Sequence, residues 1–344
     1  MPKVLDKALW KRRHAGWWLA PLWMMMVGFA VGAEAQTCQT VADMDAPVRT
    51  ALETSATRYF KMFAHGESPA LRQNAIPSLA ADFGGIEAVV KENQPAMAGA
   101  QPTVRPPFLL TLEGTQPLPR AEFLCGVFGA NGQTRDSAVF VLNSLPPGKY
   151  AVAIVDATGT DDASALTMIL QQLGADWKLA GVFVRASQVS GHDASWFTQR
   201  AREFKTKGQN RNAWLYFREA IILTTPADIM STLATDKLYD EAQTVQPTDL
   251  PADGNVVNMA AGGTTYKLTA IFPQGASGEL DLVVRYQAAD ISNTLQTFQS
   301  NNTLIKALVA KFPEFRDAFA GVAARAIDPS GQGYGSMLPM KEIK

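Results

Sequence analysis

The sequence predicts an α+β protein. Helical periodicity dominates the first part of the chain, apolar and polar residues alternate from residue 105, and helical periodicity then returns before a second, shorter alternating part. Helices and strands that are grouped rather than interleaved favour an α+β fold over a parallel sheet. We therefore expect N-terminal helices on a curved antiparallel sheet, then a helical hairpin, then a small C-terminal α+β domain.

Residues 1–35 have the composition of a signal peptide. Five basic side chains precede an apolar run over 17–32, and the small residues Ala33 and Ala35 follow it. The run is shorter than the roughly 20 residues that a membrane-spanning helix needs. We expect cleavage before Gln36, which would leave no stable membrane anchor and a mature protein that is periplasmic or secreted. An uncleaved anchor is the alternative.

The charge of the mature chain argues against nucleic-acid binding. Removal of residues 1–35 takes five of the 31 basic and two of the 32 acidic residues, which leaves 26 basic against 30 acidic residues and a net charge of −4. A nucleic-acid ligand requires a basic footprint on the protein. The sequence therefore predicts a protein partner or a small apolar ligand, and no nucleic acid.

Both cysteines, Cys38 and Cys125, lie in the mature part of the chain. An even number of cysteines in an oxidising compartment permits a disulfide. Cys38 precedes the first predicted helix, and Cys125 lies in a strand that this helix is expected to cover. A Cys38–Cys125 disulfide is therefore possible, and two unpaired thiols are the alternative.

A cone-type α+β domain is predicted over 36–190. Apolar residues recur at helical spacing over 45–63 and in shorter pieces over 69–98. Strands are predicted over 105–112, 123–128, 138–142, 150–155, 166–173 and 177–184, with tight turns at 146–148 and 174–176. The order of these segments predicts a single antiparallel meander.

The second half of the mature chain is predicted to contain a helical hairpin and a further α+β domain. Helical periodicity over 195–243, divided by Gly208 and Pro226, places the hairpin domain at 191–245. The proline and glycine content of 246–263 is typical of a linker. A C-terminal domain over 264–344 is expected to hold strands at 266–272, 280–286, 322–327 and 337–340 and a helical stretch at 291–319.

The order of elements over about 40–188, and the tryptophan that opens the last strand at Asp176-Trp177, carry a resemblance to a known superfamily. This segment resembles the nuclear-transport-factor-like superfamily, in which N-terminal helices lie across a cone-shaped sheet. The superfamily includes enzymes, ligand carriers and domains without chemistry, so the resemblance implies no catalytic residue. Core packing is the favoured interpretation for most of the aromatic side chains of this segment, and lining of the cone cavity is the alternative for five of them: Tyr59, Phe63, Phe108, Tyr150 and Trp177.

Residues 194–226 are similar to one tetratricopeptide unit. The unit requires large, small and glycine residues at fixed positions, and these are occupied by Phe197, Ala201, Phe204, Gly208, Ala213, Phe217 and Ala220. Pro226 lies one residue later than the pattern asks. One repeat cannot bury its apolar face alone, so we expect this hairpin to pack on a neighbouring domain. A generic helical hairpin is the alternative.

Motifs of catalysis and of metal or cofactor binding are missing from the sequence. The mature chain holds two histidines, His65 and His192, whereas a metal site usually combines two or three His or Cys residues at close spacing. Asp193 precedes a helix and is expected to cap it, with a catalytic His192–Asp193 pair as the alternative. We predict no catalytic residue, no cofactor and no metal site. The sequence favours a non-enzymatic binding or interaction protein of the cell envelope; an exported hydrolase or isomerase that uses the cone interior is the alternative.

Overall fold

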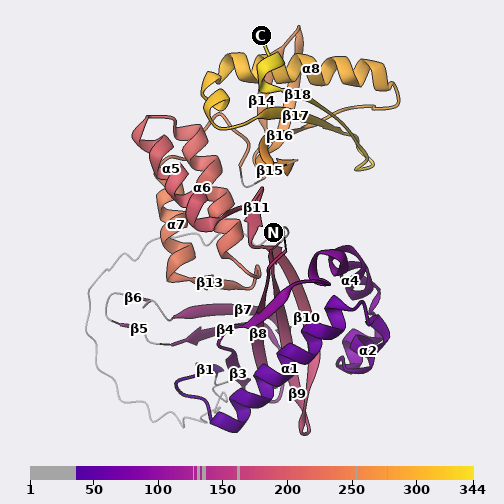
Figure 1. Cartoon of the computed structure of the whole chain (residues 1–344), viewed down its shortest axis with the longest axis vertical. Coiled ribbons are helices and arrows are strands. Elements are labelled where there is room, and N and C mark those ends of the chain that lie inside the picture. The colour runs from indigo at the N-terminus through magenta and orange to yellow at the C-terminus, as the bar shows by residue number, and fades with distance from the viewer. Residues whose placement is uncertain are drawn as a thin grey trace, which may run out of the picture. The chain divides into compact units, whose positions relative to one another are not determined.

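The α+β class is confirmed by the computed structural model (Figure 1), which describes residues 36–126, 128–129, 132–133, 137–160, 163–252, 254–276 and 278–344. The predicted signal peptide over 1–35 lies outside these residues. Within the described ranges, no helix has the length and hydropathy needed to cross a membrane.

The N-terminal domain packs helices against one face of a six-stranded antiparallel sheet. Its helices are α1 (Ala46–Ala64), α2 (Ser68–Gln73), α3 (Pro77–Ala81) and α4 (Gly84–Met97). The strand order is β1 (Gln36–Gln39), β3 (Phe108–Leu112), β8 (Gly148–Thr158), β9 (Ser164–Leu173) and β10 (Asp176–Ala186), with β2 (Gln101–Val104) beside β8. The turn at Gly174 joins β9 to β10 in the predicted hairpin, with a φ of 64° at the glycine.

A second sheet covers the other face of the first. It contains β13 (Met230–Thr232), β7 (Ala138–Leu145) and β4 (Leu118–Cys125) in that order, while β5 (Phe128–Gly129) and β6 (Gly132–Gln133) form a separate short pair. The prediction of a single meander is therefore wrong. The reason lies in the faces: β4 buries alternate residues only, whereas β8 is buried on both faces and suits the middle layer.

Side chains of β8 show how the layers are filled. Ala151, Ala153 and Val155 pack under α1 and α4, and the small alanines let α1 bring Tyr59 close to the sheet. Tyr150, Val152 and Ile154, which point the other way, pack against the second sheet. The N-terminal domain therefore has two apolar clusters, one on each side of the six-stranded sheet.

Three helices follow a small ribbon of β11 (Gln188–Val189) and β12 (His192–Asp193): α5 (Ala194–Thr206), α6 (Asn210–Thr224) and α7 (Leu233–Gln243). Gly208 ends the turn between α5 and α6 with a φ of 74°, a conformation that favours glycine. The residues that match the tetratricopeptide pattern, apart from this glycine, are all buried: Phe197, Ala201, Phe204, Ala213, Phe217 and Ala220.

Ala220→Leu is expected to destabilise this helical segment by about 1–3 kcal/mol, because the larger side chain overpacks a closed helix contact. Ala220 is 0% exposed. Thermal unfolding measures the effect, and Ile222→Leu on the exposed side of α6 serves as the matched control. An unchanged melting temperature for Ala220→Leu would show that the contact can open without cost.

The C-terminal domain is a five-stranded sheet with one long helix on one face (Figure 1). Its strands run in sequential order: β14 (Val257–Ala261), β15 (Thr264–Ala276), β16 (Glu279–Gln287), β17 (Gly321–Ile327) and β18 (Gly333–Pro339). Helix α8 (Thr294–Lys311) connects β16 to β17, which are the parallel pair, and short 3₁₀ turns cover Pro313–Asp317 and Met340–Glu342.

The linker predicted over 246–263 is wrong for its second half, because Val257–Ala261 is strand β14. The two glycines that suggested a linker, Gly262 and Gly263, form the two-residue hairpin loop to β15, with φ values of 56° and 79°. Two successive residues with positive φ are what a type I′ turn demands. Leu250 and Ala252, in the first half, are buried in the neighbouring core.

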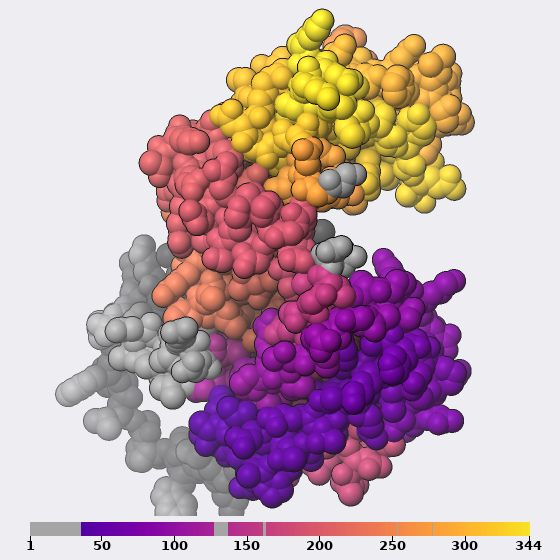
Figure 2. All heavy atoms as spheres, in the orientation of Figure 1, coloured from indigo at the N-terminus to yellow at the C-terminus, as the bar shows by residue number. Residues whose placement is uncertain are grey.

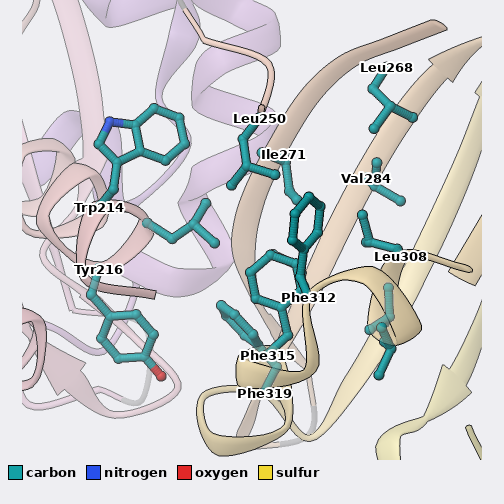
Figure 3. Packing of buried hydrophobic residues seen from close by; sticks show 14 of the residues in the cluster. Trp214, Tyr216, Leu250, Leu268, Ile271, Val284, Leu308, Phe312, Phe315 and Phe319 are labelled. Carbon is teal, nitrogen blue, oxygen red and sulfur yellow. The ribbon is translucent and has the colours of Figure 1, made fainter. Parts of the chain in front are cut away.

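One apolar cluster joins the helical segment to the C-terminal domain. Figure 3 shows Trp214 and Tyr216 of α6 on one side, and Phe312, Phe315 and Phe319 on the other. The space-filling view shows the two parts in continuous contact (Figure 2). A hydrogen bond crosses the same junction: the Tyr216 hydroxyl donates to the carbonyl of Ala318 at 2.7 Å. The helices are therefore packed on a neighbour, as the single repeat-like hairpin required.

Candidate functional site

The five aromatic residues named as a possible lining of the cone belong to two separate apolar clusters. Tyr59, Phe63 and Trp177 belong to the cluster under the helices, while Tyr150 and Phe108 pack on the opposite side of the sheet. The Tyr59 hydroxyl donates to the carbonyls of Asn74 and Trp177 at 2.9 and 2.8 Å. These large side chains fill the two clusters at periodic positions, as the favoured interpretation of core packing has it.

The His192–Asp193 pair is brought to the junction of the helices and the C-terminal domain, but its members face different ways. The Asp193 carboxylate accepts a hydrogen bond from the backbone N–H of Trp196 at 2.9 Å and caps α5. The His192 ring stacks on the Trp196 ring, with centroids 3.7 Å apart and planes 6° from parallel. This geometry separates the carboxylate from the imidazole.

His192 lines a groove of about 360 Å³ whose polar residues are engaged in structural contacts. Arg316 donates to the carbonyls of Met340 and Ile343, and Arg200 holds Glu203. Burial raises the pKa of Tyr216 to about 12, so its hydroxyl stays protonated and keeps its bond to Ala318. The polar residues that line the groove therefore hold the helical segment and the C-terminal domain together.

His65 lies at the exposed end of α1, where its Nδ1 is 3.5 Å from a carboxylate oxygen of Glu67. Among the residues that the structure describes, no group of three or more His, Cys, Asp or Glu side chains could hold a metal ion.

A concavity lies in a place that the sequence did not single out, on the uncovered face of the C-terminal sheet. It measures about 1040 Å³ and is bordered by Arg285, Gln287, Arg325, Ile327, Gly333 and Gly335. We call this surface the arginine face. Helix α8 packs on the opposite face, where it buries alternate residues such as Val284 and Ala324.

Strand register brings the two arginines together. Parallel strands β16 and β17 place Arg285 directly beside Arg325, with both side chains on the uncovered face. The carbon of the Arg285 guanidinium lies 5.0 Å from the centre of the Phe272 ring, and Arg325 Nη2 donates to Gln274 Oε1 at 3.1 Å. Like charges on directly neighbouring strands repel each other, so an anion between them would be stabilised.

No ion pair joins a carboxylate to either guanidinium among the described residues, whereas several other arginines of the chain form such pairs. Arg202 holds Glu241, and Arg211 holds Asp249 through two hydrogen bonds of 3.1 and 2.6 Å. The positive charge of the arginine face therefore has no anionic partner within the described part of the chain.

The acidic residue at the rim of the concavity is committed to its own loop. The Asp328 carboxylate accepts hydrogen bonds from the Ser330 hydroxyl and from the backbone N–H groups of Ser330 and Gln332, at 2.7 to 2.9 Å. These bonds, with that of the Ser330 hydroxyl the strongest, lower the pKa of Asp328, which therefore remains ionised and occupied. A further acid on the same face, Asp281, lies four residues before Arg285 along β16, about 13 Å away.

Glycines provide access to this site. Gly333 and Gly335 of β18 stand opposite Ile327 and Arg325 of β17. A Cβ on Gly335 would come within 3.3 Å of Arg325 Cγ, and one on Gly333 within 2.9 Å of Ile327 Cδ1. Because these two glycines have no side chains, the space beside Arg325 stays open to a ligand.

The sequence contains a pattern for this site that can be interpreted only once the pairing of β16 with β17 is known. Each of two apolar strands carries one arginine, in Val284-Arg285-Tyr286 and Ala324-Arg325-Ala326. The register that makes the arginines neighbours depends on the parallel crossover through α8. The chain matches no known protein family, no curated protein and no solved structure.

Proposed function

We propose that this protein is an exported, non-enzymatic binding protein that holds an anionic ligand on the arginine face of its C-terminal domain. The observation that carries the proposal is the pair of guanidiniums without a carboxylate partner, Arg285 and Arg325, side by side in a concavity of about 1040 Å³. Guanidinium groups bind carboxylates and phosphates through charge-assisted, often bidentate hydrogen bonds.

The chemistry of the face favours binding over catalysis. It is lined by the side chains of two arginines, one glutamine, one threonine and one aspartate, together with apolar residues and glycines. Arginines position and neutralise an anion, whereas general acid–base catalysis needs a group that exchanges protons near neutral pH. The acid at the rim, Asp328, is held by its loop.

The N-terminal domain acts in this proposal as a scaffold of the nuclear-transport-factor-like type with a filled interior. Aromatic and aliphatic side chains occupy both sides of its central sheet. The basic, apolar and small-residue order of 1–35 supports export, and a disulfide suits an oxidising compartment.

The proposal predicts that an octaglutamate peptide binds the mature protein through the two arginines. The double variant Arg285→Gln/Arg325→Gln is expected to weaken binding at least about 10-fold, since two charge-assisted contacts are lost. Isothermal titration calorimetry at low ionic strength measures the dissociation constant. Added salt should also weaken the wild-type complex, because exposed charges are screened.

The matched control removes two positive charges from other surfaces of the same domain. Lys306→Gln/Lys341→Gln carries the same change in net charge at exposed positions on α8 and after β18. This variant is expected to bind octaglutamate as the wild type does. Equal affinities of the wild type and both double variants would reject the arginine face as the anion site.

A further inference from the structure

Strand β18 is one of the two edge strands of the C-terminal sheet; β14 is the other. Strand β18 pairs with β17 on one side and ends the order of strands within the described residues. Its alternate residues Gly333, Gly335 and Met337 are exposed, and Met337 keeps 48% of its surface accessible. An exposed edge offers a row of unpaired backbone groups to another strand.

The register identifies which backbone groups point outward. Asp328 N–H donates to the Gln332 carbonyl at 2.9 Å, and Met340 N–H donates to the Ala320 carbonyl at 2.7 Å. Both pairs fit the β17–β18 register, in which hydrogen-bonded and non-hydrogen-bonded pairs alternate. The hydrogen-bonded residues of β18 are therefore Tyr334, Ser336 and Leu338.

The N–H and C=O groups of Gly333, Gly335 and Met337 consequently face the free edge. Pro339, the next residue in this outward series, has no N–H and closes the edge at the end of the strand. The open stretch thus offers three residues in alternation, which matches a short added strand of about five to seven residues.

The same three residues share the face of the two arginines. Gly335 stands opposite Arg325, which stands beside Arg285. A strand added to β18 would lie two strand spacings from β17, or about 10 Å. An acidic side chain opposite Gly335 could reach Arg325 across that distance, because the glycine leaves no side chain in between.

We infer that β18 accepts an extended, acidic segment of a partner protein as a sixth strand of this sheet. The backbone of β18 supplies the hydrogen bonds, and Arg325 and Arg285 select an acidic side chain at alternate positions of the added strand. This inference rests on the proposed function and specifies its ligand as a peptide in strand conformation.

Charge favours a partner over a second copy of this chain. Antiparallel pairing of two β18 strands about Gly335 would bring a second Arg325–Arg285 pair onto the same face. Two such pairs would repel each other, whereas an acidic strand neutralises one pair.

The test attaches a probe strand to the protein itself. The heptapeptide Thr-Val-Glu-Val-Glu-Val-Thr follows Lys344 through a flexible linker of about 12 glycine and serine residues, which gives an effective concentration in the millimolar range. Amide hydrogen exchange is read by NMR on glycine-labelled protein. We expect exchange at Gly333 and Gly335 to slow at least 10-fold relative to the chain without the probe strand, and to remain unchanged at Gly321 inside the sheet.

Two substitutions at Met337 test the contribution of the β18 backbone, and a second probe peptide tests the contribution of charge. Met337→Pro removes an outward N–H without removing a β17–β18 bond, and is expected to abolish the protection; Met337→Ala, which keeps the N–H, should retain it. With a probe that has glutamine in place of both glutamates, the protection of Gly333 and Gly335 should be at least about five-fold smaller than with the glutamate probe. Should Met337→Pro fail to fold, the glutamine probe still tests whether acidic side chains are required. Exchange in the wild-type protein with the glutamate probe still tests whether a strand is added to β18.

The outcomes distinguish this inference from the proposed function. Octaglutamate binding that depends on the arginines, without protection of Gly333 and Gly335 by the tethered strand, overturns strand addition and leaves the anion site in place. Equal protection by the glutamate and glutamine probes overturns the acidic class of partner. If the chain without the probe strand already shows slowed exchange at Gly333 and Gly335, and this protection grows with protein concentration, the edge pairs with a second copy of the chain instead.

Discussion

Replacing Cys38 and Cys125 with alanine is expected to lower the free energy of unfolding by about 2–4 kcal/mol. The structure joins these residues by a disulfide with Cα atoms 5.0 Å apart and a sequence separation of 87. Cys38 lies in β1 at the edge of the six-stranded sheet, and Cys125 ends β4 of the second sheet. The bridge therefore fastens the two sheets to each other.

The physical reason is the restriction of the unfolded chain. Closing a loop of this length removes more conformational entropy than closing a short one. Cys125 is 0% exposed, so its replacement also leaves a small defect between the two sheets.

Urea-induced unfolding of the double variant and of the wild type measures the loss. Wild-type protein kept in a reductant is the control, since it should unfold at nearly the same urea concentration as the double variant. Two free thiols in denatured protein that was purified without reductant would contradict the disulfide.

Glu219→Gln is expected to stabilise the protein by about 3 kcal/mol above pH 8 and by far less at pH 5. Glu219 lies on α6, is 7% exposed, and has its pKa raised to about 7 by burial, against a smaller lowering by Arg218. A carboxyl group with this pKa is protonated in the folded protein under conditions in which the unfolded chain has already released the proton.

The direction of the pH effect follows from that difference. Below about pH 4.5 both states hold the proton, and Glu219 does not disfavour folding. As the pH rises through 7, the unfolded state gains from ionisation while the folded state must bury a charge, so stability falls. Glutamine has nearly the same size and no proton to lose, so it removes this loss.

Denaturant unfolding of the wild type and Glu219→Gln at pH 5 and pH 8.5 measures the difference, and taking the difference between the two proteins cancels the other titrating groups. Glu113→Gln, at an exposed loop position, is the matched control and should change stability little at either pH. A stabilisation by Glu219→Gln that is equal at both pH values would show that the carboxyl does not titrate in this range.

Local patterns in the sequence were sufficient for the class of fold and for most of its elements. Helix α1 appears where apolar residues recur at helical spacing, and the β9–β10 hairpin turns at Gly174 as predicted. The periodicity of an element reports which of its faces is buried, and that information is local. The segments 45–63, 166–173 and 177–184 were therefore placed within two residues or so of their observed bounds.

Sequence alone misplaced two features whose outcome depends on which segments pair as strands. The second sheet includes β13, which follows α6 and pairs with β7 about 90 residues earlier, so its third strand comes from a distant segment. The glycines at 262 and 263 suggested a linker, yet they turn a hairpin because β15 provides a partner for Val257–Ala261. Turn residues have the same composition in loops and in hairpins, so only the partner distinguishes them.

Composition and residue patterns specify an α+β chain with a mildly acidic mature part, two cysteines able to pair, and apolar patterns for most helices and strands. The candidate site, in contrast, exists only in the folded chain. Arg285 and Arg325 are 40 positions apart, and their meeting requires the parallel pairing of β16 and β17 across α8. Residue spacing records the face on which a side chain lies, but the neighbour across the sheet is set by strand order and register, which the free energy of the whole packed domain selects.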